Sequence, residues 1–289
     1  MLNENLRLAV QKNGRLTDKS LQLLRNSGLD IEEYSERLFI SARNYELDLL
    51  FLRDDDIPEY VQDGVADIGI VGEDIIFEKR AEVKIIRKLG YGKCRLALAL
   101  PESKQLNKLE ELSGKRIATS FPHILQDFLD KNNIKAKIVE ISGSVEIAPS
   151  LGVADYICDL VSTGNTLKLN KLKKSFDVFE SQAALIVNKD LELNDGKHEI
   201  LQNFLFRIDS ALRAKSSKYL MMNAPKESLD SIKSILPSLK SPTVVPLADS
   251  NMIAVHAVIP AEEFWNIFNK LTEAGASGIL LLPIENMIL

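Results

Sequence analysis

The sequence predicts an α/β protein with a two-lobed core, followed by a C-terminal module of ferredoxin-like βαββαβ order. Three observations favour this fold. Apolar, β-branched strands alternate with polar loops and amphipathic helices along the first two thirds of the chain. The tetrapeptide Gly-Val-Ala-Asp precedes an apolar strand at Gly64 and again at Gly152, too far apart for a solenoid repeat. From Lys218 onward, strands and helices follow in the βαββαβ order.

Each lobe is expected to consist of βα units whose loops, at the carboxyl ends of parallel strands, face a cleft between the lobes. In the first lobe we predict strands at 6–10, 46–53, 67–72 and 183–187, and helices at 17–27 and from 54. In the second lobe we predict strands at 96–100, 116–119, 135–140 and 156–161, with helices around 108–112, up to 131 and from 166.

A long amphipathic helix at 196–216 is expected to lead into the C-terminal module. In that module we predict strands at 219–223, 243–247, 253–258 and 278–283, and helices at 226–236 and 261–274. The resulting domains are lobe I at 1–95 and 183–217, lobe II at 96–182, and the module at 218–289. The chain crosses between the lobes more than once in this scheme, as expected of a hinge.

The composition excludes several classes of protein. The 289 residues are 45% hydrophobic and 27% charged, an ordinary globular balance. A net charge of −5 without a lysine- or arginine-rich run argues against nucleic-acid binding. Neither the N-terminus nor the apolar run at 279–282 resembles an export signal or a membrane span. Cys94 and Cys158 show no C-x-x-C spacing and the histidines no ligand spacing, so we expect a cytoplasmic protein without disulfides or zinc.

The stretch with the clearest chemistry is a strand, a polar loop and a helix. Tyr156–Val161 has the pattern of a buried strand interrupted by Asp159, and a helix starts near Thr166. The loop between them is Ser162, Thr163, Gly164 and Asn165. Hydroxyls, a glycine and the free N–H groups of a helix N-terminus form a cup for a phosphate. Asp155 and Asp159 beside it favour a phosphorylated sugar, although an ordinary capping turn is the alternative.

Two further polar turns are candidates for substrate contact. Lys12 and Arg15 flank Gly14 after the first strand, an arrangement suited to a pyrophosphate or triphosphate, but a basic turn is more often a solvated surface. Three aspartates at 54–56 follow the second strand and are able to hold magnesium. Acidic first turns also complement the helix dipole, which is the reading we favour for Asp54 and Asp55.

Together with Glu146, the loop resembles the phosphoribosyl-pyrophosphate loop of ATP phosphoribosyltransferases, the enzymes that open histidine biosynthesis. The likeness extends to segments at 11–16, 53–58, 67–72 and 119–122, and to the tail from residue 218. The chain is therefore identified as a member of the long, self-regulated form of this family. The resemblance implies a two-lobed, periplasmic-binding-protein-like catalytic core and a ferredoxin-like regulatory domain.

The resemblance implies a reaction as well. The phosphoribosyl group of phosphoribosyl pyrophosphate would move to N1 of ATP, with inversion at the sugar carbon, giving N1-(5-phosphoribosyl)-ATP and pyrophosphate. Positive charge builds on the sugar ring, so nearby carboxylates stabilise the transfer without a covalent nucleophile. Mg²⁺, held largely by substrate phosphates, and basic groups would stabilise the departing pyrophosphate. No residue is assigned to the metal.

The implied site residues follow from the matching segments. Those implied as catalytic are Glu146, Asp159, Lys12 and Arg15. Those implied as substrate-binding are Arg53, Asp56, Gly72, Asp155, Ser162, Thr163, Gly164, Asn165 and Thr166. Glu146 and Asp159 would bind the ribose hydroxyls, with Asp155 as a supporting neighbour. The loop would hold the 5-phosphate, and the basic residues would serve the polyphosphates.

A minimal phosphoribosyltransferase does not need the tail, because all of these groups precede Ala184. The resemblance implies that the tail binds histidine, the end product of the pathway, as an inhibitor. The implied contacts are Asn223, Leu239, Thr243, Val258 and Gly278. Some relatives carry an acidic residue in place of Asn223, which would pair with the amino group of histidine. Core packing is an equally good explanation for Leu239 and Val258.

Two other functions stay open. Two lobes and a hinge are also the plan of solute-binding proteins and effector-binding modules, but these need a signal peptide or a DNA-reading segment, and the sequence shows neither. An inactive paralogue acting as a regulatory subunit is the other alternative, although the catalytic set above is present. The family further implies a homo-oligomer, dimer and hexamer, with ATP, phosphoribosyl pyrophosphate and histidine as partners, and neither nucleic acid nor membrane.

Overall fold

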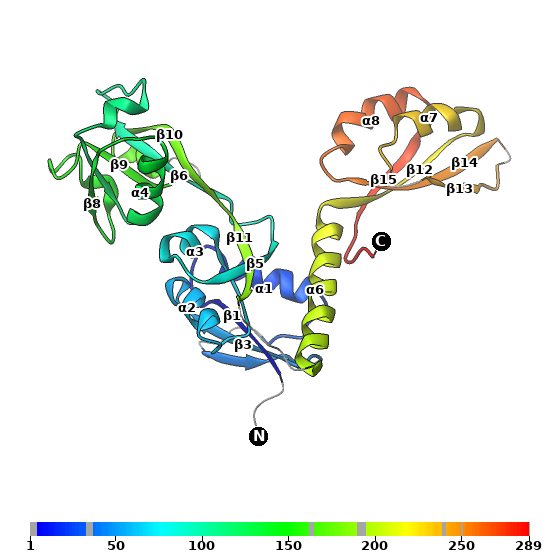
Figure 1. Cartoon of the computed structure of the whole chain (residues 1–289). Helices are drawn as coiled ribbons and strands as arrows, with labels where there is room; N and C mark the ends of the chain where they lie inside the picture. Colours follow the sequence, from blue (N-terminus) through cyan, green and yellow to red (C-terminus); the bar gives the residue numbers. More distant parts are fainter. Residues whose placement is uncertain are drawn as a thin grey trace. The chain divides into compact units, whose positions relative to one another are not determined.

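The structure is a computed structural model that describes residues 5–32, 37–161, 165–189, 195–238, 241–249 and 251–288. The chain forms two compact units, Met1–Gln22 with Asp30–Ile200, and Leu23–Leu29 with Leu201–Leu289. The strands form a six-stranded and a five-stranded sheet in the first unit and a four-stranded sheet in the second (Figure 1). The predicted domain boundaries, with a module starting at 218, stay a prediction, since contacts group residues 201–217 with the C-terminal sheet.

The six-stranded sheet forms the first lobe. Its strands, in spatial order, are β2 (Phe39–Ser41), β3 (Leu47–Leu52), β1 (Leu6–Gln11), β4 (Ile68–Gly72), β11 (Ala183–Asn188) and β5 (Val83–Lys88). β1 is parallel to β3 and β4, whereas β11 is antiparallel to β4 and β5. Helices α1 (Thr17–Asn26), α2 (Ile57–Gln62) and α3 (Glu73–Lys79) follow β1, β3 and β4. The buried side chains of α2 pack against β11, which holds the returning strand in this sheet.

The five-stranded sheet forms the second lobe. Its spatial order is β10 (Leu172–Ser181), β6 (Cys94–Pro101), β9 (Tyr156–Val161), β7 (Arg116–Thr119) and β8 (Lys137–Glu140). β7 is parallel to β8 and β9, and β6 is antiparallel to β9 and β10. The helical segments are the 3-10 helices Leu109–Leu112 and Val145–Ile147, α4 (Pro122–Lys131) and α5 (Asn165–Leu169). β6 leaves the first lobe and β10 returns to it, so the predicted double crossing is confirmed (Figure 1).

Most predicted strands and helices of the core are confirmed, and their ends agree within three residues. The elements β2, β5, α3 and β10 were not predicted. The largest error follows the loop at 162–165. We predicted a lysine-bearing helix from Thr166, yet α5 has only five residues and the following lysines belong to β10. Leu172 is buried there and the strand pairs along its length with β6. A partner strand distant in sequence therefore overrides the local helical pattern.

The two Gly-Val-Ala-Asp segments fold in the same way. In the first, the backbone N–H of Arg7 donates to the Asp67 carboxylate over 2.7 Å, and the Asp67 N–H donates to the Arg7 carbonyl over 2.9 Å. In the second, Arg116 and Asp155 exchange the same two bonds, both over 2.9 Å. Each arginine also donates to the carbonyl of the glycine three residues before its aspartate. Both aspartates thus tie two neighbouring parallel strands at their amino ends.

The second unit contains the C-terminal sheet. Its spatial order is β13 (Thr243–Pro246), β14 (Met252–Pro260), β12 (Ser217–Pro225) and β15 (Ser277–Pro283), all antiparallel. Helices α7 (Leu229–Ile235), entered through the 3-10 helix Lys226–Ser228, and α8 (Phe264–Glu273) cover one face (Figure 1). The predicted βαββαβ order is confirmed. The predicted long helix is α6 (Asp195–Lys215), and no helix in the described ranges has the length and apolar character that crossing a membrane requires.

Candidate active site

A cleft of about 800 Å³ lies between the two sheets of the first unit. Its walls are the turn after β1, the acidic turn after β3, the end of β4, the turn after β7 and the segment after β8. These are carboxyl ends of mutually parallel strands, where the backbone leaves polar groups open to a ligand. The cleft therefore collects part of the first-lobe groups that the sequence singled out. Arg15, Gly72, Asp54 and Asp55 line it, whereas its lining residues do not include Lys12, Arg53 or Asp56.

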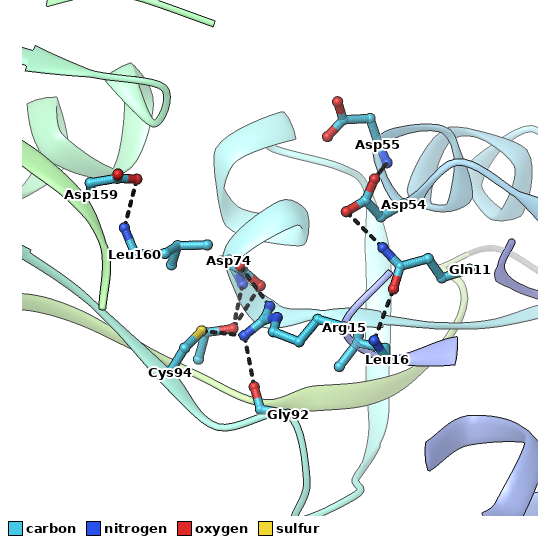
Figure 2. Close-up of polar contacts among 11 residues, drawn as sticks. Gln11, Arg15, Leu16, Asp54, Asp55, Asp74, Gly92, Cys94, Asp159 and Leu160 are labelled. Atoms are coloured by element: carbon cyan, nitrogen blue, oxygen red, sulfur yellow. Dashed lines mark hydrogen bonds and ion pairs between the residues drawn. The ribbon is translucent and has the colours of Figure 1, made fainter. Parts of the chain in front are cut away.

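Arg15 lines this cleft and is held by several polar contacts, which Figure 2 shows. Its Nη1 donates to the Gly92 carbonyl over 2.8 Å and to the Cys94 thiol, while its Nη2 donates to Asp74 over 3.2 Å. Burial raises the pKa of the Cys94 thiol, which therefore accepts the bond as a neutral group. These partners were not predicted, because they come from the segment that leads into β6, from β6 itself and from the start of α3.

A second contact shapes the basic turn itself. The Gln11 side chain donates to Asp54 over 3.0 Å and accepts the backbone N–H of Leu16 over 3.0 Å (Figure 2). Burial, and then the neighbouring charge of Asp55, raises the pKa of Asp54. The half-buried Lys12 is anchored by its backbone to the end of β3, and among the described residues its ammonium has no ion-pair partner. A cation without a partner is thus available beside the cleft.

The acidic turn differs from the prediction. Residues 54–56 form a 3-10 helix before α2, and neither helix has a side-chain capping bond at its N-cap, Arg53 or Asp56. Asp54 instead receives the Gln11 amide and lines the cleft, so complementing the helix dipole does not fully explain it. Arg53 is exposed and, in the described part of the chain, unpaired. Gly72 ends β4 in the cleft wall, where an added Cβ would meet Asp74 at 2.0 Å.

Glu146 and Asp159 come together in the second lobe. Asp159 lies on β9 opposite Ala97 and accepts the backbone N–H of Leu160 over 2.8 Å. Glu146 lies in the 3-10 helix 145–147, which is held against β9 by the buried Val145 and its neighbours. Burial first, and the Glu146 charge second, raises the pKa of Asp159. A carboxylate whose ionised form is disfavoured, with a second carboxylate beside it, is thus placed where a positive centre would be stabilised.

Asp155 lies apart from this pair. It precedes β9, at the end of the strand remote from the loop at 162–165, and its carboxylate is bound by Arg116. The backbone N–H of Arg116 is the main cause that lowers the pKa of Asp155. Its carboxylate thus takes part in strand pairing, as that of Asp67 does, and the expectation that it supports the ribose-binding carboxylates stays a prediction.

The predicted phosphate cup falls mostly beyond the described residues. Ser162, Thr163, Gly164 and the side chain of Asn165 lie outside them. Thr166 is exposed in the first turn of α5, and its carbonyl accepts the Asn170 side chain. The cup itself stays a prediction, but its two flanks, the end of β9 and the start of α5, are where the sequence places them.

One contact across the cleft was not predicted at all. The carboxylate of Glu78 on α3 accepts the backbone N–H groups of His123 and Ile124, over 3.0 and 3.1 Å, at the N-terminus of α4. Arg80 and Asp127 form an ion pair of 3.0 Å between the same two helices. Because α3 and α4 belong to different lobes, these contacts tie the lobes together. The sequence gives little indication of these contacts, because the residue that caps the N-terminus of α4 comes from the other lobe.

Three of the residues implied for histidine lie on the face of the C-terminal sheet opposite its helices. Val258 alternates with the buried Ala257 and Ile259, so it points away from the helix-side core and plain core packing does not explain it. Thr243 pairs with His256 and is exposed. Asn223 lies near Gly278, where an added Cβ would meet its amide at 3.4 Å. Leu239 lies outside the described residues.

Comparison with known proteins then decides the family. The model of the ATP phosphoribosyltransferase family matches residues 53–210, and the model named HisG, C-terminal domain, matches residues 214–286. The chain belongs to the ATP phosphoribosyltransferase family. The predicted family, its long form and its enzymatic nature are thereby confirmed.

Relatives of this family align over nearly the whole chain. The ATP phosphoribosyltransferases of Cytophaga hutchinsonii and Parabacteroides distasonis are each 48% identical over 283 residues, 98% of this chain, and 98% and 99% of theirs. A solved structure, the ATP phosphoribosyl transferase (HisG:HisZ) complex from Thermotoga maritima, is 31% identical with a TM-score of 0.59 over 71% of this chain and 96% of that one. The predicted two-lobed, periplasmic-binding-protein-like core with a ferredoxin-like C-terminal domain is confirmed.

Proposed function

We propose that the protein transfers the phosphoribosyl group of phosphoribosyl pyrophosphate to N1 of ATP, releasing pyrophosphate, as the first step of histidine biosynthesis. The observation that carries this proposal is the Glu146–Asp159 pair at the flank of the hydroxyl-rich loop. An anionic pair is unsuited to a phosphate alone but suited to ribose hydroxyls and to a sugar that becomes positive in the transition state. Family membership supports the same chemistry.

In this reaction the two lobes supply opposite charges. Glu146 and Asp159 bind the ribose hydroxyls and stabilise the positive sugar ring, and the loop up to Thr166 holds the 5-phosphate. Lys12, Arg15 and Arg53 hold the polyphosphates from the other wall of the cleft. The lobes thereby align N1 of the adenine with the sugar carbon, and alignment of two bound reactants accounts for a large part of such a rate enhancement.

Magnesium fits the acidic turn of the cleft. Asp54 and Asp55 are adjacent carboxylates, and their mutual repulsion helps to raise the pKa of Asp54. A cation beside them would relieve that repulsion, while the described residues contain no group of three or more metal-binding side chains. This is the usual situation of Mg²⁺, which one or two carboxylates and the substrate phosphates hold. Bound there, the ion would neutralise charge on the departing pyrophosphate.

We also propose that histidine inhibits the enzyme through the C-terminal domain, by way of Asn223, Thr243, Val258, Gly278 and Leu239. The exposed position of Thr243 and the outward direction of Val258 support a ligand or a second subunit on this sheet face. A homo-oligomer, dimer and hexamer, and a cytoplasmic location are part of the same proposal. The two cysteines, both free and buried, suit a reducing compartment.

The test is pyrophosphate release from ATP and phosphoribosyl pyrophosphate by the purified protein, with mass analysis of the nucleotide product. We expect phosphoribosyl-ATP in amounts equal to pyrophosphate. Thr163→Val should weaken phosphoribosyl pyrophosphate binding roughly ten- to hundredfold, because one charge-assisted bond to the 5-phosphate is lost. A folded protein that binds both substrates and releases nothing would instead be a regulatory subunit, and one that binds neither would refute the proposal.

A further inference from the structure

Asp74 is a buried carboxylate whose two oxygens are both used. It is 1% exposed and lies at the start of α3, directly after the end of β4. One oxygen accepts the Ser181 hydroxyl over 2.7 Å, and the Asp74 N–H donates back to that hydroxyl over 3.0 Å. The other oxygen accepts the Arg15 guanidinium over 3.2 Å (Figure 2). Burying a carboxylate costs free energy unless hydrogen-bond or ion-pair partners compensate it. For Asp74, the ion-pair partner is Arg15.

The observed contacts of Arg15 therefore use only part of its hydrogen-bonding capacity. A guanidinium has five N–H donors, and the bonds to Asp74, Gly92 and Cys94 use three of them. The side chain remains 37% exposed at the cleft. The remaining donors are thus presented to the cleft in a fixed plane, which is the geometry that two oxygens of a polyphosphate require.

We propose that Asp74 is a positioning residue of the transfer reaction, which holds Arg15 in the orientation that binds the substrate polyphosphate. Ser181, at the end of the crossover strand β10, holds Asp74 in turn and so connects Arg15 to the hinge. The inference rests on the proposed function, in which Arg15 contacts polyphosphate. The Asp74 charge does not cancel that role, because Asp74 is buried and its two oxygens already accept hydrogen bonds from Arg15 and Ser181.

The proposal requires that Asp74 acts through Arg15, and a double-mutant cycle on the full chain tests this directly. The probe is inorganic pyrophosphate, with binding measured by calorimetry for the wild type, Asp74→Asn, Arg15→Ala and the double variant. Asp74→Asn keeps the shape but loses the charge, and we expect about tenfold weaker binding. The double variant should bind no more weakly than Arg15→Ala alone. Losses that multiply, or unchanged binding by Asp74→Asn, would overturn the proposal.

Kinetics separate positioning from a general loss of structure. Asp74→Asn should raise the KM of the polyphosphate substrates more than it lowers kcat, whereas a kcat loss at unchanged KM would overturn the proposal. Asp177→Asn is the matched control, since Asp177 lies on the same strand β10 and its ion pairs within the described residues are with the exposed Arg95 and with Lys174. This control should behave as the wild type.

A second variant covers the case in which Asp74→Asn does not fold. Ser181→Ala removes one hydroxyl and should weaken pyrophosphate binding about threefold, an effect that should vanish in the Arg15→Ala background. An effect of equal size in that background would overturn the proposal. The binding cycle is independent of turnover. If the wild type forms no phosphoribosyl-ATP yet shows the expected cycle, the proposed reaction fails while the positioning role stands.

Discussion

At the scale of single residues, the candidate site contains a carboxylate whose ionised form is disfavoured by its surroundings. Asp159 is half-buried beside Glu146, and both burial and that neighbour raise its pKa above the ordinary value of 3.8. The folded protein therefore takes up the proton more readily than the unfolded chain. A residue that destabilises the free protein in its charged form is a candidate for function, because a ligand or a positive transition state can offset the repulsion.

Asp159→Asn should separate the effect of the Asp159 charge on activity from its effect on stability. In activity, kcat should fall on the order of 100-fold, with a smaller change in KM, if the charge acts on the positive sugar ring. In stability, the wild-type carboxyl contributes fully below its unfolded pKa, and this contribution is lost as the pH rises through the raised folded pKa. The melting temperature of the variant should therefore exceed that of the wild type at about pH 8 and match it at about pH 4. A variant that loses only affinity would make Asp159 a passive ribose ligand.

Gly72 offers a test of close packing in the cleft wall. Its backbone is extended, so alanine is conformationally allowed, but the new Cβ would meet the Asp74 carboxylate at 2.0 Å and Arg15 at 3.4 Å. Gly72→Ala should destabilise the protein by about 1–3 kcal/mol and raise the KM of the polyphosphate substrates. Gly143→Ala is the matched control, because nothing lies within 4 Å of its added Cβ. Equal behaviour of the two variants in thermal unfolding and kinetics would contradict the assigned contacts.

At the scale of strands and helices, the repeated Gly-Val-Ala-Asp segment serves strand pairing in both lobes. The two copies differ in burial: the Asp67 side chain is 4% exposed and also binds Lys197 over 2.9 Å, whereas that of Asp155 is 29% exposed. The same hydrogen bonds are therefore expected to contribute more in the first lobe, where water competes less.

Paired asparagine substitutions measure this difference. Asp67→Asn removes the carboxylate charge that pairs with the nearly buried Lys197 ammonium and should cost about 3 kcal/mol or more of unfolding free energy. Asp155→Asn should cost about 1 kcal/mol and leave kcat and KM unchanged in the folded protein. Denaturant unfolding and steady-state kinetics give the two numbers. Full stability with lost activity in Asp155→Asn would return that residue to the active site.

At the scale of the whole molecule, the C-terminal domain is expected to add regulation to a core that already holds every proposed catalytic group. Histidine should slow pyrophosphate release by the wild type, which requires that it binds one arrangement of the protein more tightly than another. Thr243→Val should retain activity but need roughly tenfold more histidine, because the exposed hydroxyl is lost while the shape is kept. Thr272→Val is the matched control, because the bonds of the Thr272 hydroxyl in the described part of the chain are to carbonyls of its own helix.

Native mass measurement extends this experiment to assembly. The oligomer distribution of the wild type should shift when histidine is added, and Thr243→Val should shift only at higher concentration. If calorimetry detects no histidine binding and pyrophosphate release is unaffected, the regulatory proposal fails. The open sheet face would then serve assembly alone.

The sequence by itself determined the order of most elements, because their signals are local. Alternation marked β1, β9 and the C-terminal strands, and turn residues marked their ends. The sequence also indicated the family, through short segments whose chemistry depends on residue type. These segments indicated Lys12, Arg15, Glu146 and Asp159 from residue type and position alone.

Only the tertiary structure decided what those residues touch. β10 forms because β6, distant in sequence, offers it hydrogen bonds, and local pattern carries no information about such a partner. Asp155 and Asp159 look alike in the sequence, yet one faces Arg116 at the amino end of β9 and the other faces Glu146 farther along that strand. The Asp74 carboxylate gained its partners from two segments that are distant in sequence, the turn with Arg15 and the end of β10 with Ser181. Such contacts depend on which chain segments folding brings together, and burial then sets their strength.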